Sequence, residues 1–169
     1  TECPDTAILA KVIGEEQLSQ ALGDIVDPKQ KGLLSAQWSN TNKYYKMPQK
    51  NGQAPGQFGI FIDPTKCKGC AECVAVCSDQ ALSMIPKQPG LLDEYKTMLQ
   101  FFKSLPETPD MYVNEKVLSD MMLKDRSLLY VGGAGSCMGC GEATSIRMML
   151  AATGFVYGAE SVAIVAATG

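Results

Sequence analysis

The sequence contains no histidine and a single tryptophan among its 169 residues. Without an imidazole the chain cannot form a Ser–His or Cys–His catalytic pair or a zinc site with histidine ligands. No apolar run approaches the ~20 residues that cross a bilayer. The opening stretch, Thr1 to Asp5, has neither the basic start nor the apolar core of a signal peptide. The chain also lacks an initiator methionine, so we expect it to begin inside a longer protein.

Charge is nearly balanced, with a formal net charge of −3 at pH 7. Nucleic-acid binding usually needs a basic patch, so no nucleic-acid partner and no membrane partner are expected. A hydrophobic content of 46% and a charged content of 20% are typical of a globular protein. What the chain does have is seven cysteines, six of them in two tight groups and one, Cys3, standing apart. Without a secretion signal, such groups favour metal ligands in a reducing compartment, and we expect a cytoplasmic metalloprotein.

The strongest motif is Cys-x-x-Cys-x-x-Cys-x-x-x-Cys, formed by Cys67, Cys70, Cys73 and Cys77. The first three thiolates can wrap one face of an iron–sulfur cubane, with Gly69 keeping the turn tight. The fourth is expected in the first turn of a following helix, pointing away, as in two-cluster ferredoxins, where it binds the other cluster. The spacing predicts a bacterial-ferredoxin-type [4Fe–4S] module. The alternative, a zinc site, calls for two separated Cys-x-x-Cys knuckles.

If Cys77 points away, the first cluster needs a fourth ligand, and Cys3 is the candidate. The segment after Cys3 matches the segment after Cys77 as an internal repeat, except that Ser78 stands where Pro4 does. One interpretation therefore gives the first cluster Cys3 and the first three thiolates of the motif, and assigns Cys77 to a second cluster. The alternative places all four cysteines of the motif on one cluster and leaves Cys3 unused. Either way one ligand set is incomplete, as in a fragment.

A second pair, Cys137 and Cys140, lies in a glycine-rich turn before an expected helix. Spacing alone leaves three interpretations open: half of a metal site, a thioredoxin-like redox pair, or a structural turn with incidental thiols. Helix-terminal N–H groups there could stabilise thiolates or an anion. Two cysteines cannot complete a cubane, so the metal interpretation needs ligands from elsewhere.

Periodicity and turn residues predict the elements around these motifs. A short strand is expected within residues 1–9 and another over residues 58–62. An Asp63-Pro64 turn follows the second of these, and a further strand is expected over residues 81–85, after the cysteine motif. The remaining expectations are a helix containing Val12 to Ile25, a surface loop over 40–57, helices over 91–102, 117–122 and 142–152, and strands over 128–131 and 161–167. The domain boundaries follow: a partial ferredoxin-type domain over 1–86 with an insertion over 10–57, a helical connector over 87–126, and the start of an α/β domain over 127–169.

Taken together, the motifs resemble the thiamine-diphosphate-dependent 2-oxoacid:ferredoxin oxidoreductases, most closely the pyruvate:ferredoxin (flavodoxin) oxidoreductase family. The ferredoxin module is split between Cys3 and Cys67, the segment from Cys137 to Glu142 looks like the Cys-x-Gly-Cys-Gly-Glu signature of the family, and the closing Ala-Thr-Gly looks like the strand end before its next cysteine. The resemblance implies an α+β ferredoxin-like two-cluster module with an insertion, followed by the start of an α/β thiamine-diphosphate-binding domain.

The resemblance also implies roles for individual residues. Cys137 and Cys140 would bind a proximal [4Fe–4S] cluster, and Glu142 would contact thiamine diphosphate. The alternative interpretation is that Glu142 has no role in cofactor binding and is simply an acidic residue favoured by the helix dipole in the first turn of a helix. The family's magnesium-diphosphate segment and its residues that bind the 2-oxoacid are absent, so no catalytic residue is assigned, and the chain alone is expected to be inactive.

The implied parent enzyme has up to three [4Fe–4S] clusters and thiamine diphosphate with magnesium. It would relay single electrons from a thiamine-diphosphate intermediate through the clusters to ferredoxin or flavodoxin. The reaction would be the coenzyme A-dependent oxidative decarboxylation of a 2-oxoacid, with pyruvate favoured by the resemblance, or the reverse carboxylation. Its partners would be that 2-oxoacid, coenzyme A, the electron acceptor and the rest of the parent chain or other subunits. Two alternatives are a non-catalytic [4Fe–4S] electron-carrier subunit or adaptor, and a zinc-binding scaffold.

Overall fold

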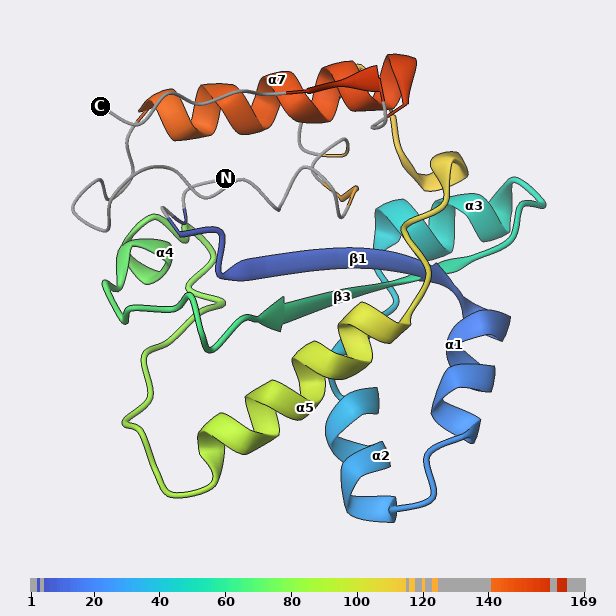
Figure 1. Cartoon of the computed structure of the whole chain (residues 1–169). Helices are drawn as coiled ribbons and strands as arrows, with labels where there is room; N and C mark the ends of the chain where they lie inside the picture. Colours follow the sequence, from blue (N-terminus) through green and yellow to red (C-terminus); the bar gives the residue numbers. More distant parts are fainter. Residues whose placement is uncertain are drawn as a thin grey trace.

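The computed structural model describes residues 3, 5–114, 116–117, 120, 123–124, 141–158 and 161–163. The elements in chain order are β1 (Ile8–Gly14), α1 (Glu15–Gly23), α2 (Pro28–Ser35), β2 (Trp38–Ser39), the π-helix η1 (Asn42–Lys46), α3 (Met47–Lys50), β3 (Gly56–Ile62), α4 (Glu72–Ala75), α5 (Leu91–Ser104), the 3-10 helix η2 (Asp110–Tyr112) and α7 (Gly141–Tyr157). Helices α1, α2 and α5 lie on one side of the β1–β3 pair and α7 on the other (Figure 1). None of the described helices combines the length and the apolar character that crossing a bilayer requires.

The sheet has three antiparallel strands in the order β1-β3-β2. Its register pairs Ile8 with Ile62 and Gly14 with Gly56, so the start of β1 lies beside the end of β3. Gly59 lets the Trp38 ring pack directly on β3, because a Cβ at this position would lie 2.7 Å from that ring. The strand pairing therefore brings the segments that precede β1 and follow β3 to the same end of the sheet.

The buried face of β3 carries Phe61 and not Ile60. Phe61 is fully buried, whereas Ile60 is 41% exposed. Phe61 meets Trp38 edge-on with ring centroids 5.4 Å apart and Phe102 of α5 at 5.2 Å. Residues 58–62 were correctly predicted as a strand, and the large rings of the neighbouring elements decide which of its faces is buried.

Helix α5 supplies much of the main core. Its buried side chains include Met98, Leu99 and Phe102, as the apolar periodicity predicts, while Leu92 is exposed. The helix ends at Ser104, two residues before Pro106, because proline cannot continue a helix. The buried members of this cluster are Leu9, Ile13, Leu18, Leu34, Trp38, Phe61, Met98, Leu99, Phe101, Phe102 and Leu105.

Lys11 of β1 is fully buried and caps the end of α5. Its Nζ donates to the carbonyls of Phe102 and Leu105 at 3.2 Å and of Pro106 at 3.0 Å, and lies 4.4 Å from the centre of the Phe102 ring. Carbonyls at a helix C-terminus have no partner within the helix and favour a positive group. Lys11 therefore fixes the end of α5 against the outer edge of β1.

Several expected elements differ in the structure. Val12 and Ile13 belong to β1, so the helix that was expected to contain them starts only at Glu15. The stretch 40–57, expected as a loop, contains η1, α3 and the start of β3. Residues 81–85 form no strand, and Met84 and Ile85 are about half exposed. Without a neighbouring strand to pair with among the described residues, an apolar run does not become part of a sheet.

The C-terminal expectations are tested only in part. The helix expected over 142–152 is present as α7 and extends to Tyr157. Residues 161–163 form no strand, and the rest of the expected strand up to 167 lies outside the described residues, as do residues 128–131 and most of 117–122. The sheet and helices of residues 3–114 are an α+β arrangement that fits the predicted ferredoxin-like module.

Candidate iron–sulfur site

Five cysteines that were predicted as cluster ligands lie at one end of the fold. Cys3 precedes β1, Cys67 and Cys70 follow β3, Cys73 lies in α4, and Cys77 comes two residues after α4 ends. Helix α4 is a single turn, so Cys77 is not in the first turn of a following helix as expected. Cys67 is exposed and the other four are half-buried, and no disulfide joins them to one another.

Two tertiary contacts hold the Cys3 segment beside the Cys67 segment. The N–H of Asp63 donates to the carbonyl of Ala7 at 2.7 Å, which continues the β1–β3 ladder toward the cysteines. Beyond it, the Lys68 ammonium forms an ion pair with the Asp5 carboxylate at 2.9 Å. The segments that carry the predicted ligands Cys3 and Cys67, which are 64 positions apart in the chain, are thereby joined.

Asp63 orders the turn that leads into the motif. Its carboxylate accepts hydrogen bonds from the Thr65 backbone N–H at 2.9 Å and the Thr65 hydroxyl at 2.6 Å, and its carbonyl accepts from the Cys67 N–H at 3.0 Å. Burial alone would raise the pKa of the Asp63 carboxyl, but the hydrogen bonds from Thr65 outweigh it and hold that pKa below its ordinary value of 3.8. The predicted Asp63-Pro64 turn is confirmed.

The loop between Cys67 and Cys73 has the backbone shape of an anion-binding nest. Gly69 has φ of +73° and Ala71 has φ of +63°. Left-handed residues alternating with ordinary ones turn successive N–H groups toward one side, and such concavities bind phosphates and iron–sulfur clusters. Ala71 adopts this conformation although a Cβ disfavours it by about 1–2 kcal/mol. The residues present therefore fit a negatively charged cluster.

Cys3 and Cys77 open turns with matching hydrogen bonds. The N–H of Ala7 donates to the Cys3 sulfur at 3.2 Å, and the N–H of Ala81 donates to the Cys77 sulfur at 3.3 Å. In both cases the donor is the alanine four residues after the cysteine. Hydrogen bonds to ligand sulfur are one means by which proteins adjust iron–sulfur clusters. The internal repeat inferred from the sequence thus has a counterpart in the geometry of the two sulfurs.

The two turns also share an unusual backbone conformation. Thr6 and Gln80, each three residues after its cysteine, both have φ of +52°, and each donates its N–H to the carbonyl of that cysteine. Among the described residues, the non-glycine positions with positive φ are Thr6, Ala71 and Gln80, all in cysteine-bearing segments. Strained backbone of this kind gathers at functional sites. Among the described residues, the strained non-glycine positions therefore coincide with the cysteine-bearing segments.

Other expected ligands fall outside the description. Cys137 and Cys140 lie outside the described residues, and Glu142 lies in the first turn of α7 with its side chain outside the description. Within the described residues, no three cysteine or carboxylate side chains converge tightly enough to hold one metal ion. A cubane distributes its four thiolates over four irons, so its ligands need not meet at a single point.

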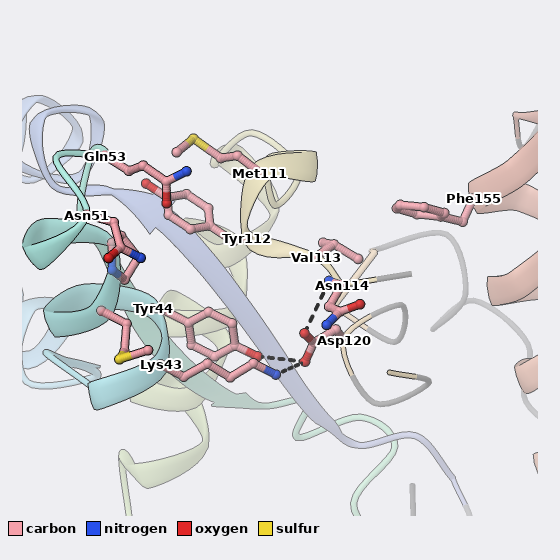
Figure 2. A pocket seen from close by; sticks show the side chains of 12 residues that line it. Lys43, Tyr44, Asn51, Gln53, Met111, Tyr112, Val113, Asn114, Asp120 and Phe155 are labelled. Atoms are coloured by element: carbon pink, nitrogen blue, oxygen red, sulfur yellow. Dashed lines mark hydrogen bonds and ion pairs between the residues drawn. The ribbon is translucent and has the colours of Figure 1, made fainter. Parts of the chain in front are cut away.

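A separate pocket of about 530 Å³, which the sequence did not indicate, opens beside η1 and η2 (Figure 2). At its edge the buried carboxylate of Asp120 accepts hydrogen bonds from Lys43, from the Tyr44 hydroxyl at 3.0 Å and from the Asn114 N–H at 3.2 Å. Burial and the hydrogen bond to Asp120 raise the pKa of Tyr44. The charged groups that line this pocket, Lys43 and Asp120, are paired with each other, and no cysteine of the described residues lines it.

Comparisons with known proteins agree with the cysteine motif. Residues 60–83 match the family Fer4, described as a 4Fe-4S binding domain. No solved structure matches the chain at comparable significance. The assignment of each cysteine to a particular cluster stays a prediction.

Curated relatives match most of the chain. A pyruvate-flavodoxin oxidoreductase of Nostoc sp. is 26% identical over 155 residues. Proteins named for the same activity in Synechocystis sp. and Escherichia coli are 24% and 25% identical over 155 and 158 residues. In each case the match covers 87% of this chain and 11% of the relative, so the chain spans about a ninth of those proteins. The chain is therefore similar along most of its length to pyruvate-flavodoxin oxidoreductases, and its match to a 4Fe-4S binding domain over residues 60–83 supports an iron–sulfur electron-transfer role.

Proposed function

We propose that this chain is the electron-relay segment of a larger 2-oxoacid:ferredoxin oxidoreductase that oxidises pyruvate with coenzyme A and passes single electrons to flavodoxin or ferredoxin. The names of the relatives support the activity, and the 4Fe-4S domain supports the relay. The observation that carries the proposal is the concentration of left-handed, non-glycine backbone in the three cysteine segments. A bound [4Fe–4S] cluster supplies one-electron chemistry.

In this proposal Cys3, Cys67, Cys70 and Cys73 hold one cluster, and Cys77 serves a second. The β1–β3 pairing positions Cys3 beside the motif. The nest at Gly69 and Ala71 orients N–H groups toward the negatively charged cluster, and the Ala7 N–H donates to the Cys3 sulfur. Through these hydrogen bonds and through burial the chain sets how readily the site accepts an electron.

The same proposal assigns Cys137 and Cys140 to a proximal cluster and Glu142 to thiamine diphosphate, on the family resemblance. These residues would connect the relay to the site where the 2-oxoacid reacts. The domain boundaries at residues 86 and 126 belong to this proposal as well.

Ligand assignment is tested by comparing Cys3→Ser with Cys77→Ser in the full-length protein, purified without oxygen. We expect each variant to lose about four irons, because each removes a ligand of a different cubane. Low-temperature electron paramagnetic resonance should show that Cys3→Ser and Cys67→Ser remove the same signal, whereas Cys77→Ser removes another. If Cys3→Ser keeps all its iron while Cys77→Ser matches Cys67→Ser, all four motif cysteines bind one cluster and the split assignment is wrong.

Catalysis is tested with the same full-length protein. Pyruvate with coenzyme A should reduce the clusters, and flavodoxin or ferredoxin should reoxidise them. Dithionite serves as the control, since it reduces any intact cluster. If dithionite reduces the clusters but no 2-oxoacid does, the protein is a non-catalytic carrier. The metal content of the purified protein is measured as well. If the protein contains zinc in place of iron, it cannot relay electrons as proposed.

A further inference from the structure

The ion pair between Asp5 and Lys68 links the two segments that are proposed to hold one cluster. Lys68 lies between Cys67 and Cys70 in the chain, and Asp5 lies two residues after Cys3. The two charged groups approach to 2.9 Å. The Asp5 side chain is 15% exposed and that of Lys68 is 42% exposed, so this pair is less screened by solvent than an ordinary surface pair.

The matching turn has no such pair. Asp79 occupies, two residues after Cys77, the position that Asp5 occupies after Cys3. Asp79 is exposed, and within the described part of the chain no lysine forms an ion pair with it. The two turns therefore share a backbone conformation, but only the carboxylate of Asp5 is paired with a lysine from the loop between Cys67 and Cys70.

A charge at this position acts on the energy of electron transfer. When a [4Fe–4S] cluster with four thiolates accepts one electron, its net charge becomes one unit more negative, and no bond forms or breaks. A nearby ammonium favours that reduced state, and a nearby carboxylate opposes it. Lys68 and Asp5 therefore have opposite effects, and in the intact pair these effects largely cancel.

We propose that the two charges of the Asp5–Lys68 ion pair act in opposite directions on the reduction potential of the cluster held by Cys3, Cys67, Cys70 and Cys73, so that their pairing keeps either charge alone from shifting that potential. This inference rests on the proposed iron–sulfur function. Both residues act on the cluster as positioning and tuning groups through their charge, and neither is a ligand. A mere structural clamp makes a different prediction, because loss of either partner would then weaken the site in the same way.

The test is a redox titration of the full-length holoprotein, followed by electron paramagnetic resonance, for Lys68→Met, Asp5→Asn and the double variant. We expect Lys68→Met to lower and Asp5→Asn to raise the equilibrium constant for reduction, each on the order of three- to tenfold. The double variant should return close to the wild type. As controls, Lys96→Met and Asp93→Asn remove the partners of an exposed ion pair on α5 and should change nothing.

Several results would overturn the proposal. If both single variants keep all their iron and have the reduction potential of the wild type, the charges of the pair do not act on the cluster. Shifts in the same direction, or loss of iron from both single variants while Lys68→Arg retains it, would show that the pair is only a clamp. Absence of any [4Fe–4S] signal from the wild-type protein would instead contradict the proposed function, so the two failures are distinguishable.

Discussion

The turn that begins at Cys3 and the turn that begins at Cys77 have matching hydrogen bonds and a left-handed residue at the same position, but different surroundings. The first continues into β1, which pairs with β3, and carries the Asp5–Lys68 ion pair. The second continues into residues 81–88, which form no helix or strand. The comparison indicates that a turn of this shape is set locally, whereas its attachment to the rest of the molecule depends on tertiary contacts.

The attachment of the Cys3 turn through β1 can be broken at Lys11. We expect Lys11→Met to leave the carbonyls of Phe102, Leu105 and Pro106 without their donor and to cost about 3 kcal/mol. Hydrogen exchange of the full-length protein should then be roughly 100-fold faster in β1 and at the end of α5. Lys96→Met, on the exposed side of α5, is the matched control. An equal effect on residues 77–81 would contradict the claim that β1 anchors only the Cys3 turn.

A smaller effect is expected at Asp63, which joins the end of β3 to the cysteine loop. Asp63→Ala removes the acceptor of both Thr65 hydrogen bonds and should cost about 1–2 kcal/mol, measured by hydrogen exchange over residues 60–70. Asp79→Ala, which removes an exposed carboxylate two residues after Cys77, should change exchange there by less than about 0.5 kcal/mol.

The pKa of Asp63 fixes the pH dependence of this contribution. Because that pKa is lowered in the folded protein, the stabilisation is fully present above its ordinary value of 3.8 and is lost as pH falls through the lower folded value. Between pH 5 and pH 8, the difference between Asp63→Ala and the wild type should therefore stay constant. A difference that shrinks steadily below pH 7 would show that another group supplies the effect.

The smallest effects are expected at the left-handed residues themselves. Gln80→Gly should stabilise its turn by about 0.5 kcal/mol, since glycine relieves the strain of positive φ but adds freedom to the unfolded chain. Thr6→Gly should destabilise by about 1 kcal/mol, because Thr6 is buried and its side-chain packing is lost. Local hydrogen exchange over residues 3–7 and 77–81 measures both. If Gln80→Gly and Thr6→Gly stabilise their turns by the same amount, the burial of Thr6 does not distinguish the two turns.

Much of the site was predictable because its signals are local. The cysteine spacing indicated a ferredoxin-type module, and the 4Fe-4S domain match over residues 60–83 agrees. The similarity of the segments after Cys3 and Cys77 predicted a repeat, which the matching sulfur hydrogen bonds support. The strand over 58–62 and helix α5 followed from periodicity and from the prolines after Ser104.

Other features were not predictable from local pattern. Val12 and Ile13 fit a helical spacing but form part of β1, because β3, more than 40 residues later, provides hydrogen-bonding partners. The expected strand over 81–85 has no such partner in the described part of the chain and does not form. The Asp120 network beside the pocket joins residues more than 70 positions apart, and no motif announced it.

The local sequence was enough to predict an iron–sulfur module and to set the shape of the turns that carry Cys3 and Cys77, because both depend on neighbours within a few positions. Only the tertiary structure decided that Phe61 rather than Ile60 is buried, that Lys11 caps α5, and that Lys68 pairs with Asp5. The physical reason is that these contacts join segments far apart in the chain. Their geometry depends on strand register and on the packing of large side chains, which the spacing of residues along the sequence does not specify.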